Sequence, residues 1–440
     1  MYRLPQKRKF RQTRVLAITT FTLFNAIVRT IRQNKYFGII LFVVALIVTA
    51  SCVEEFETDS IKYEKLMVVD ANISDQVKAH SVRLFYTVPI DSEVSQGETA
   101  ITGATVWVED DQANRIDFTE TSPGTYYSPS DFAGTPGRSY ALFITTNNGK
   151  NYQSSFQELV SSPEITNIYN RYHVELGDGE ATSNPGVQFF IDVENANQGS
   201  QFYRYEWVDT HQIIVPYPKE VEAVHNGQRY TVVPFDEDVE ECYRETRFNE
   251  LVLATSTNND NGQLTEVPIK FSSAQDFDVT TKYAIQVTQR SISPEAYSYY
   301  RKIELFNESN GSLFDKQQGI IVGNITSLND PEEEVLGFFE VSGASSKRVY
   351  LDLTDLDPAV SEYIFRVCQE YGALSFDGSI EDFYAALDVQ EELRGTEVSR
   401  RSQFLIYRVG YTGEYMFSHR LCIDCTRRGS LGKPDYWELD

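Results

Sequence analysis

Short runs of β-forming residues, separated by turn residues, recur along most of this chain and restrict its fold more than any other feature. Residues 139–144 alternate between apolar and polar positions, and Asn148-Gly149 follows them. Asn-Gly between two such runs is the strongest short hairpin signal, because both residues tolerate positive φ. Comparable runs cover residues 66–69, 82–86, 105–109, 187–193, 203–208 and 283–288. The pattern predicts a mainly β fold.

The runs divide into two predicted units. Residues 66–161 carry short strands at regular spacing with turns between them, which predicts an N-terminal immunoglobulin-like β-sandwich. Residues 164–440 predict a larger antiparallel β domain with one or two helices, and Ser161-Ser162-Pro163 marks the expected boundary.

Within the second unit, a further Asn-Gly pair, Asn261-Gly262, lies between the runs 251–253 and 267–271. By the same argument this pair predicts a second hairpin, in which the two flanking strands are antiparallel neighbours.

One helix is expected near residues 294–310. Apolar residues recur there at helical spacing: Ala296, Tyr299, Tyr300, Ile303 and Phe306. Ser293 can cap this helix, Pro294 suits its first position and Asn310-Gly311 can end it. A second helix is expected after Ser379, where acidic residues favour the positive end of the helix dipole.

The first 51 residues have the composition of a secretory signal. They contain no Asp or Glu, and basic residues precede an apolar run at 37–50. This run is shorter than the roughly 20 apolar residues that a membrane-spanning helix needs. The run ends in Thr49-Ala50-Ser51-Cys52, with Thr49 where bacterial lipoprotein signals usually carry Leu. We expect cleavage before Cys52 and lipidation of its thiol. Two or three acyl chains would then anchor the protein, because one chain alone binds a membrane only marginally. The alternative is an uncleaved anchor in which Cys52 is incidental.

A second apolar stretch, 15–28, has its own basic flank. A translation start assigned too far upstream would account for it.

An acidic tether, residues 52–65, is expected after the cleavage point. Glu54, Glu55 and Glu57 resemble an export tag of surface-exposed lipoproteins, and a simple solvated tether is the alternative. Removal of the nine basic residues that precede Cys52 leaves 30 basic against 64 acidic residues, a formal charge of −34. Such a surface repels nucleic acid and anionic lipid headgroups, so nucleic acid is not expected as a partner, and the membrane is expected as one through the lipid anchor.

Four cysteines follow the lipid cysteine: Cys242, Cys368, Cys422 and Cys425. An even number in an exported chain predicts structural disulfides, and three connectivities are open. A redox or zinc function for the Cys422-Ile423-Asp424-Cys425 motif is disfavoured, because no βαβ pattern precedes it and no second CxxC exists.

Motifs of the common catalytic sites are absent from the sequence. It contains no H-E-x-x-H, G-x-S-x-G, P-loop or G-x-G-x-x-G, and its five histidines are scattered. The acidic run 236–241 is expected to be a solvated face rather than a calcium site. We therefore predict no enzymatic activity, no metal and no cofactor.

Several segments, taken in their order, resemble a family of Bacteroidota outer-membrane lipoproteins, the domain-of-unknown-function family 4249. The resembling segments are residues 66–71, 82–84, 103–108, 124–126, 137–140, 293–300, 323–325, 336–339 and 422–437. The resemblance implies an outer-membrane lipoprotein whose relatives are neighbours of TonB-dependent receptors. It supplies no catalytic residues.

The leading hypothesis is a surface-exposed outer-membrane lipoprotein that binds a ligand or assists a TonB-dependent transporter as its partner. A structural or adhesive cell-surface protein is the alternative, and a hydrolase comes third. The sequence does not identify a ligand.

Overall fold

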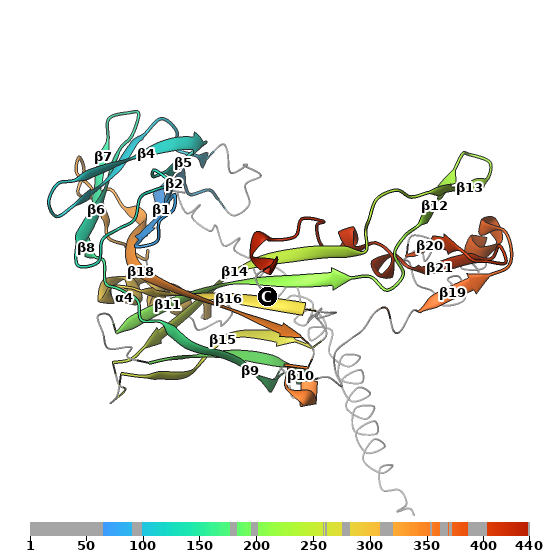
Figure 1. Cartoon of the computed structure of the whole chain (residues 1–440). Helices are drawn as coiled ribbons and strands as arrows, with labels where there is room; N and C mark the ends of the chain where they lie inside the picture. The colour runs from blue at the N-terminus through green and yellow to red at the C-terminus, as the bar shows by residue number, and fades with distance from the viewer. Residues whose placement is uncertain are drawn as a thin grey trace, which may run out of the picture. The chain divides into compact units, whose positions relative to one another are not determined.

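The computed structural model describes residues 65–89, 99–176, 183–194, 201–257, 259, 262–274, 282–308, 320–352, 354–360, 368, 372–385 and 403–438 (Figure 1). These residues belong to one unit, Lys65–Asp440. The chain is mainly β, as its alternating runs predict.

A long sheet takes in most of the strands, in the order β14-β11-β16-β18-β1-β2-β5-β4-β3-β6-β7-β17, with β8 paired to β6. Its first eight strands in the chain are β1 (Met67–Ser74), β2 (Ser81–Tyr86), β3 (Thr105–Asp110), β4 (Arg115–Ser122), β5 (Thr125–Tyr127), β6 (Ser139–Thr145), β7 (Asn151–Ser154) and β8 (Gln157–Glu158). The others are β11 (Phe202–Ile214), β14 (Glu241–Thr255), β16 (Lys282–Ser291), β17 (Ile325–Ser327) and β18 (Val335–Asp352).

The first core lies within strands β1–β8 and their neighbours. Alternate residues of these strands are buried, as in β1, where Val69 and Ile73 are fully buried. The Asn148-Gly149 hairpin between β6 and β7 is confirmed, and Gly149 has a φ of +83°. Ile325 of β17 and Phe339 of β18 complete the same core, although both lie far beyond residue 161 in the sequence.

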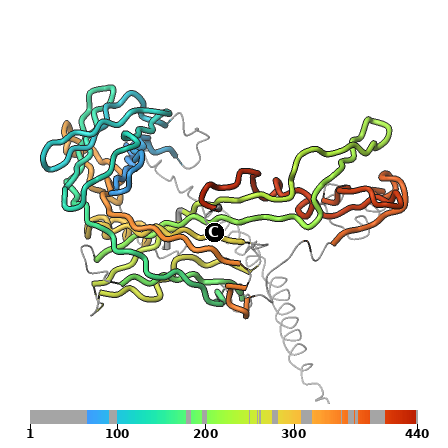
Figure 2. The backbone as a smooth tube through the Cα atoms, in the orientation of Figure 1, coloured from blue at the N-terminus to red at the C-terminus, as the bar shows by residue number. Residues whose placement is uncertain are grey.

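Strand β18 links the two parts of the long sheet. Its first half, 335–342, pairs in parallel with β1, and its second half, 343–352, pairs antiparallel with β16. Figure 2 shows this orange strand beside the blue β1. The 66–161 unit is therefore joined to the rest of the chain by continuous strand pairing as well as by its linker.

Two glycines allow β18 to come this close to its neighbours. Gly337 has a φ of +107°, and a Cβ there would lie 1.9 Å from the carbonyl oxygen of Val69. A Cβ on Gly323 would lie 1.5 Å from the carbonyl oxygen of Gly337. Only glycine fits either position, since neither contact leaves room for a side chain.

The second core is a sandwich. A sheet in the order β15-β10-β9 packs against β11, β16 and β18 of the long sheet (Figure 1). Its strands are β9 (Ile165–Leu176), β10 (Ser183–Val193) and β15 (Leu264–Ser273). Phe189 of β10 faces Tyr283 of β16 across the core, with ring centroids 5.7 Å apart.

The prediction of a hairpin at Asn261-Gly262 is wrong. Strand β14 pairs with β11, whereas β15 pairs with β10, so the chain crosses here from one sheet to the other. The physical reason is that both strands bury one face in the same core, Val252 and Ala254 from one side and Val267 from the other. Facing each other across that core, they cannot also be neighbours in one sheet.

The remaining strands form a third, smaller core. They are β12 (Val221–His225) with β13 (Tyr230–Pro234), and β19 (Ala373–Phe376), β20 (Phe404–Val409) and β21 (Tyr415–His419). Residues 380–385 are helical, and Ser379 caps them by accepting a hydrogen bond from the backbone N–H of Asp382 at 3.1 Å. The predicted second helix is confirmed at its start.

Helix α4 (Pro294–Glu308) is the other predicted helix, and it begins where the sequence indicates. Short 3-10 turns complete the described part: η1 (Pro358–Val360), η3 (Arg420–Cys422), η4 (Cys425–Arg427) and η5 (Asp435–Glu438). Among the described residues, no helix is both long enough and apolar enough to cross a membrane.

Candidate functional site

Helix α4 begins at a capping serine that also ties it to β8. The hydroxyl oxygen of Ser293 accepts a hydrogen bond from the backbone N–H of Ala296 at 3.1 Å. The same hydroxyl donates to the side-chain oxygen of Gln157 at 2.6 Å. Pro294 takes the first helical position, where a missing N–H leaves no hydrogen bond unmade. The cap thus fixes the start of the helix against the end of the first unit.

The first half of the predicted aromatic face of α4 packs onto the long sheet, whereas Phe306 near the end of the helix is 39% exposed. The ring of Tyr299 lies 5.2 Å from that of Phe338 on β18. The ring of Tyr297 lies 4.8 Å from that of Phe202 on β11. These rings form a cluster with Ala296, which is almost fully buried.

A groove follows the first turns of α4, and we call it the α4 groove. It consists of two neighbouring cavities of about 540 and 550 Å³, which share Ser155, Pro294 and Glu295. Pockets of this size commonly hold small ligands or the side chains of a partner.

The lining of the α4 groove mixes apolar and polar side chains. Its apolar members include two that are well exposed, Phe156 at 48% and Val322 at 59%. Glu158 adds a negative charge to the first cavity, Lys302 adds a positive charge to the second, and the carboxylate of Glu295 lines both. Exposed apolar groups with convergent polar neighbours are typical of binding surfaces.

A buried charge network lies beneath α4. The phenol of Tyr300 donates a hydrogen bond to the carboxylate of Glu340 at 2.8 Å. Arg204 donates two hydrogen bonds to the same carboxylate, at 2.9 and 3.0 Å. The side chain of Glu340 is 1% exposed, so its charge depends on these donors for stabilisation.

The network closes into a ring of two positive and two negative groups. Arg204 also donates to Glu206 at 2.7 Å, and Glu206 forms an ion pair with Arg290 at 3.1 Å. Arg290 donates to the hydroxyl of Ser342, which in turn donates to Glu340 at 3.1 Å. Charges therefore balance within the ring, which its buried members Glu340 and Arg290 require.

The ring shifts the titration of its two carboxylates. Burial by itself would raise the pKa of Glu206, but the charges of Arg290 and Arg204 outweigh burial and lower it to about 2. Burial would also raise the pKa of Glu340, and the charge and hydrogen bonds of Arg204 outweigh burial there too. Both groups are thus held as carboxylates at neutral pH.

Sequence reasoning did not identify this ring. Arg204 and Glu206 alternate with the aromatic residues of β11, a pattern that ordinarily places charges on a solvated face. The partner Glu340 lies 136 residues away in the sequence, so no local signal connects it to Arg204.

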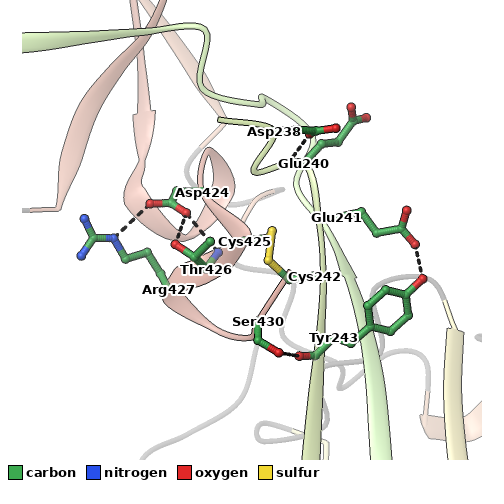
Figure 3. The surroundings of a disulfide bond; sticks show 10 residues. All are labelled: Asp238, Glu240, Glu241, Cys242, Tyr243, Asp424, Cys425, Thr426, Arg427 and Ser430. Carbon is green, nitrogen blue, oxygen red and sulfur yellow. Dashed lines mark hydrogen bonds and ion pairs between the residues drawn. A yellow bond between two sulfur atoms is a disulfide. The ribbon is translucent and has the colours of Figure 1, made fainter. Parts of the chain in front are cut away.

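The four predicted disulfide cysteines are brought together in two pairs. Cys242 at the start of β14 is bonded to Cys425, and Cys368 is bonded to Cys422. Of the three open connectivities, the structure therefore has Cys242–Cys425 with Cys368–Cys422, in which each half of the CxxC motif is joined to a distant segment. Figure 3 shows the first pair, where β14 meets the turn η4.

The chain around the first disulfide is held by further bonds. The carboxylate of Asp424 accepts a hydrogen bond from the backbone N–H of Thr426 at 3.0 Å and pairs with Arg427 at 3.2 Å (Figure 3). Ser430 and Tyr243 exchange backbone hydrogen bonds at 2.8 and 2.9 Å. The C-terminal segment is thereby fixed to β14.

The same segment continues over the outer face of the long sheet. Trp437 is 6% exposed, and its ring lies 5.2 Å from Tyr243 and 5.5 Å from Tyr350. The hydroxyl of Tyr436 lies 2.7 Å from that of Thr210. The segment 420–438 is thus a strap across β11, β14 and β18, so residues 422–437 have a packing role.

The acidic run 236–241 does not gather its carboxylates. Asp238 accepts a hydrogen bond from the backbone N–H of Glu240 at 3.2 Å, while Glu241 accepts one from the phenol of Tyr243 (Figure 3). Glu241 also accepts a hydrogen bond from the side chain of Gln212. Across the described ranges, no group of three or more His, Cys, Asp or Glu side chains is arranged to hold a metal ion.

The predicted lipid cysteine, Cys52, lies outside the described residues, as do Glu54, Glu55 and Glu57 of the expected export tag. The site that the structure does describe is the α4 groove, with the charge ring beneath the helix.

Comparison with known protein families identifies a match. A family model described as a domain of unknown function, DUF4249, matches residues 53–348, more than half of the chain. No curated protein matches this sequence.

Proposed function

The chain belongs to the DUF4249 family, and from this premise we propose that it is an outer-membrane lipoprotein of the Bacteroidota type. In this proposal its β body binds a partner or ligand as an accessory of a TonB-dependent transporter at the cell surface. The observation that carries the proposal is the junction at Cys52, where a basic and then apolar segment ends in small residues and a cysteine.

The disulfides support export. The Cys242–Cys425 bond joins residues 183 positions apart in the sequence, and the second bond joins residues 54 positions apart. Disulfides of this kind persist in oxidising compartments and are rare where thiols are kept reduced.

The α4 groove supports a binding role. It offers exposed apolar side chains, Phe156 and Val322, beside the carboxylates Glu158 and Glu295. A partner segment with apolar and basic side chains would complement it, and the strongly acidic mature chain would attract such a segment.

Co-purification tests the partner. The protein, extracted in detergent from outer membranes through an affinity tag, should bring down a TonB-dependent receptor. Phe156→Asp should weaken this association, because it places a charge in the groove. Val224→Asp is the matched control, since Val224 is similarly exposed at 46% but lies on β12. Absence of a receptor, or equal loss in both variants, would contradict the proposal and favour a structural or adhesive role.

Membrane partitioning tests the anchor separately. Wild-type protein should enter the detergent phase, and Cys52→Ala should leave a soluble or an uncleaved protein. If the variant still enters the detergent phase after cleavage at the same place, the lipid assignment is wrong.

A further inference from the structure

A lysine and an aspartate meet inside the second core. Lys270 on β15 extends across the sandwich toward Asp209 on β11, and its amine contacts the carboxylate oxygen Oδ2. The two side chains are 8% and 0% exposed. Neither takes part in the α4 groove or in the charge ring, and lysine is rarely buried so deeply in a protein.

A tyrosine completes the group. The phenol of Tyr283 on β16 donates a hydrogen bond to the other carboxylate oxygen of Asp209, Oδ1, at 2.7 Å. The same phenol oxygen lies 3.5 Å from the amine of Lys270. The amine nitrogen of Lys270 lies over the ring of Phe248, 4.5 Å from the ring centroid. The surroundings are therefore largely apolar.

Such surroundings favour neutral groups over charged ones. Burial lowers the pKa of the Lys270 ammonium to about 7, which makes the neutral amine available near neutral pH. A neutral amine is a nucleophile, and it is held here in contact with the carboxyl group of Asp209.

We propose that Lys270 and Asp209 are joined by an intramolecular amide bond, an isopeptide cross-link between the two sheets of the second core. The link would connect β15 with β11 covalently. It is a modification site within the fold, and it does not depend on the proposed transport function.

The reaction needs no oxidant and no co-reactant. The ammonium gives one proton to Oδ2 of Asp209, which produces a neutral amine and a carboxylic acid. The amine nitrogen attacks the carboxyl carbon, so that a C–N bond forms and the carbon–Oδ2 bond breaks. Oδ2 takes a second proton from the nitrogen and leaves as water, while the third proton stays on the amide nitrogen.

The phenol of Tyr283 fits the role of an oxyanion donor in this step. It already donates to Oδ1, the oxygen that carries negative charge in the tetrahedral intermediate and becomes the amide carbonyl oxygen. Burial raises the pKa of Tyr283 well above its ordinary value, so the phenol remains a donor.

Two physical effects favour the condensed product. Reactants fixed in contact can react as though present at about 10⁵–10⁸ M, which offsets the usual cost of bringing them together. The amide also replaces two buried charges by one neutral group, which removes the desolvation cost of the ion pair.

Peptide mapping of the full-length protein tests the proposal directly. After denaturation, reduction and alkylation, trypsin should release residues 205–219 linked to residues 248–282 as one branched peptide. The second peptide extends past Lys270 because trypsin does not cleave after an acylated lysine. Neither peptide contains a cysteine, so a disulfide cannot account for the branch. Its mass should be lower than that of the two peptides together by one water molecule.

Matched samples sharpen the result. Lys270→Arg preserves the positive charge but offers a poor nucleophile, so the branched peptide should disappear. Tyr283→Phe retains both reacting groups and should form the link more slowly. The exposed pair of Lys150 and Glu333, 2.8 Å apart, should remain unlinked in every sample.

The proposal fails if wild-type protein yields residues 248–270 and 205–219 only as separate peptides, since Lys270 and Asp209 would then be an ordinary buried ion pair. It fails also if Lys150 and Glu333 are linked to the same extent, because the chemistry would not be specific to the core. A Tyr283→Phe protein that links as fast as the wild type would overturn the role given to the phenol.

Discussion

Arg204 on β11 and Glu340 on β18 are joined by two parallel hydrogen bonds of 2.9 and 3.0 Å. Glu340 lies in the part of β18 that pairs with β1, three residues before β18 begins to pair with β16. The bidentate pair therefore stabilises the strand at the point where it leaves one part of the sheet for the other.

Glu340→Gln should lower the free energy of unfolding by about 3–5 kcal/mol, because it removes one partner of a buried ion pair and leaves Arg204 undercompensated. Equilibrium denaturation with guanidinium chloride measures the change. Arg247→Ala is the control, since that exposed pair with Glu245 should contribute at most about 1 kcal/mol. Equal effects of the two substitutions would show that the buried pair contributes no more to the free energy of unfolding than the exposed pair.

The free energy of unfolding should decrease as the pH is lowered below the ordinary pKa of glutamate. The folded-state pKa of Glu206 is lowered from 4.5 to about 2, so its stabilising effect is complete above 4.5 and is lost as the pH falls toward 2. The side chain of Glu206 is 40% exposed, and solvent screening should keep the effect modest. Denaturation midpoints measured at several pH values should show a smaller decline for Glu206→Gln. An identical decline for the variant would exclude Glu206 as its source.

Peptide mapping without reduction should recover Cys242 linked to Cys425 and Cys368 linked to Cys422. Replacing Cys242 and Cys425 together by serine should cost about 2–5 kcal/mol, because the bond closes a long loop and holds the strap on β14. Recovery of a Cys422–Cys425 bond, or of four free thiols, would contradict this connectivity.

Gly337→Ala should destabilise the protein severely, since its Cβ would lie 1.9 Å from the carbonyl oxygen of Val69. Gly413→Ala separates the steric clash from backbone strain as the cause. Gly413 also has a positive φ, +93°, but no atom lies within 4 Å of the added Cβ. The control should cost only about 1–2 kcal/mol from backbone strain. Thermal unfolding of both variants measures the difference, and equal costs would rule out the steric explanation.

Protease treatment of intact cells should digest the wild-type protein if its domains face outside the cell. A variant with Glu54→Ala, Glu55→Ala and Glu57→Ala should be protected while remaining lipidated, because the acidic residues next to Cys52 are proposed as the export tag. If the wild type survives while a known surface protein is removed, the surface location is wrong. If both forms are digested alike, only the assignment of the export tag is wrong.

The local elements were predictable because their signals are local. Alternation of apolar residues identified β6 and β11, and the Ser293-Pro294 start identified α4. Asn148-Gly149 correctly indicated a hairpin, but Asn261-Gly262 did not, since a turn signal specifies where the chain bends and not which sheet the next strand joins.

The sequence by itself determined the mainly β character of this protein and the start of its helices, because side-chain period and capping act within a few residues. Only the tertiary structure decided that β1 lies beside β18, that Arg204 meets Glu340, that Cys242 meets Cys425, and that Lys270 reaches Asp209. Each of these contacts joins segments far apart in the chain. Their energy depends on distance and burial in space, which no local pattern of residues encodes.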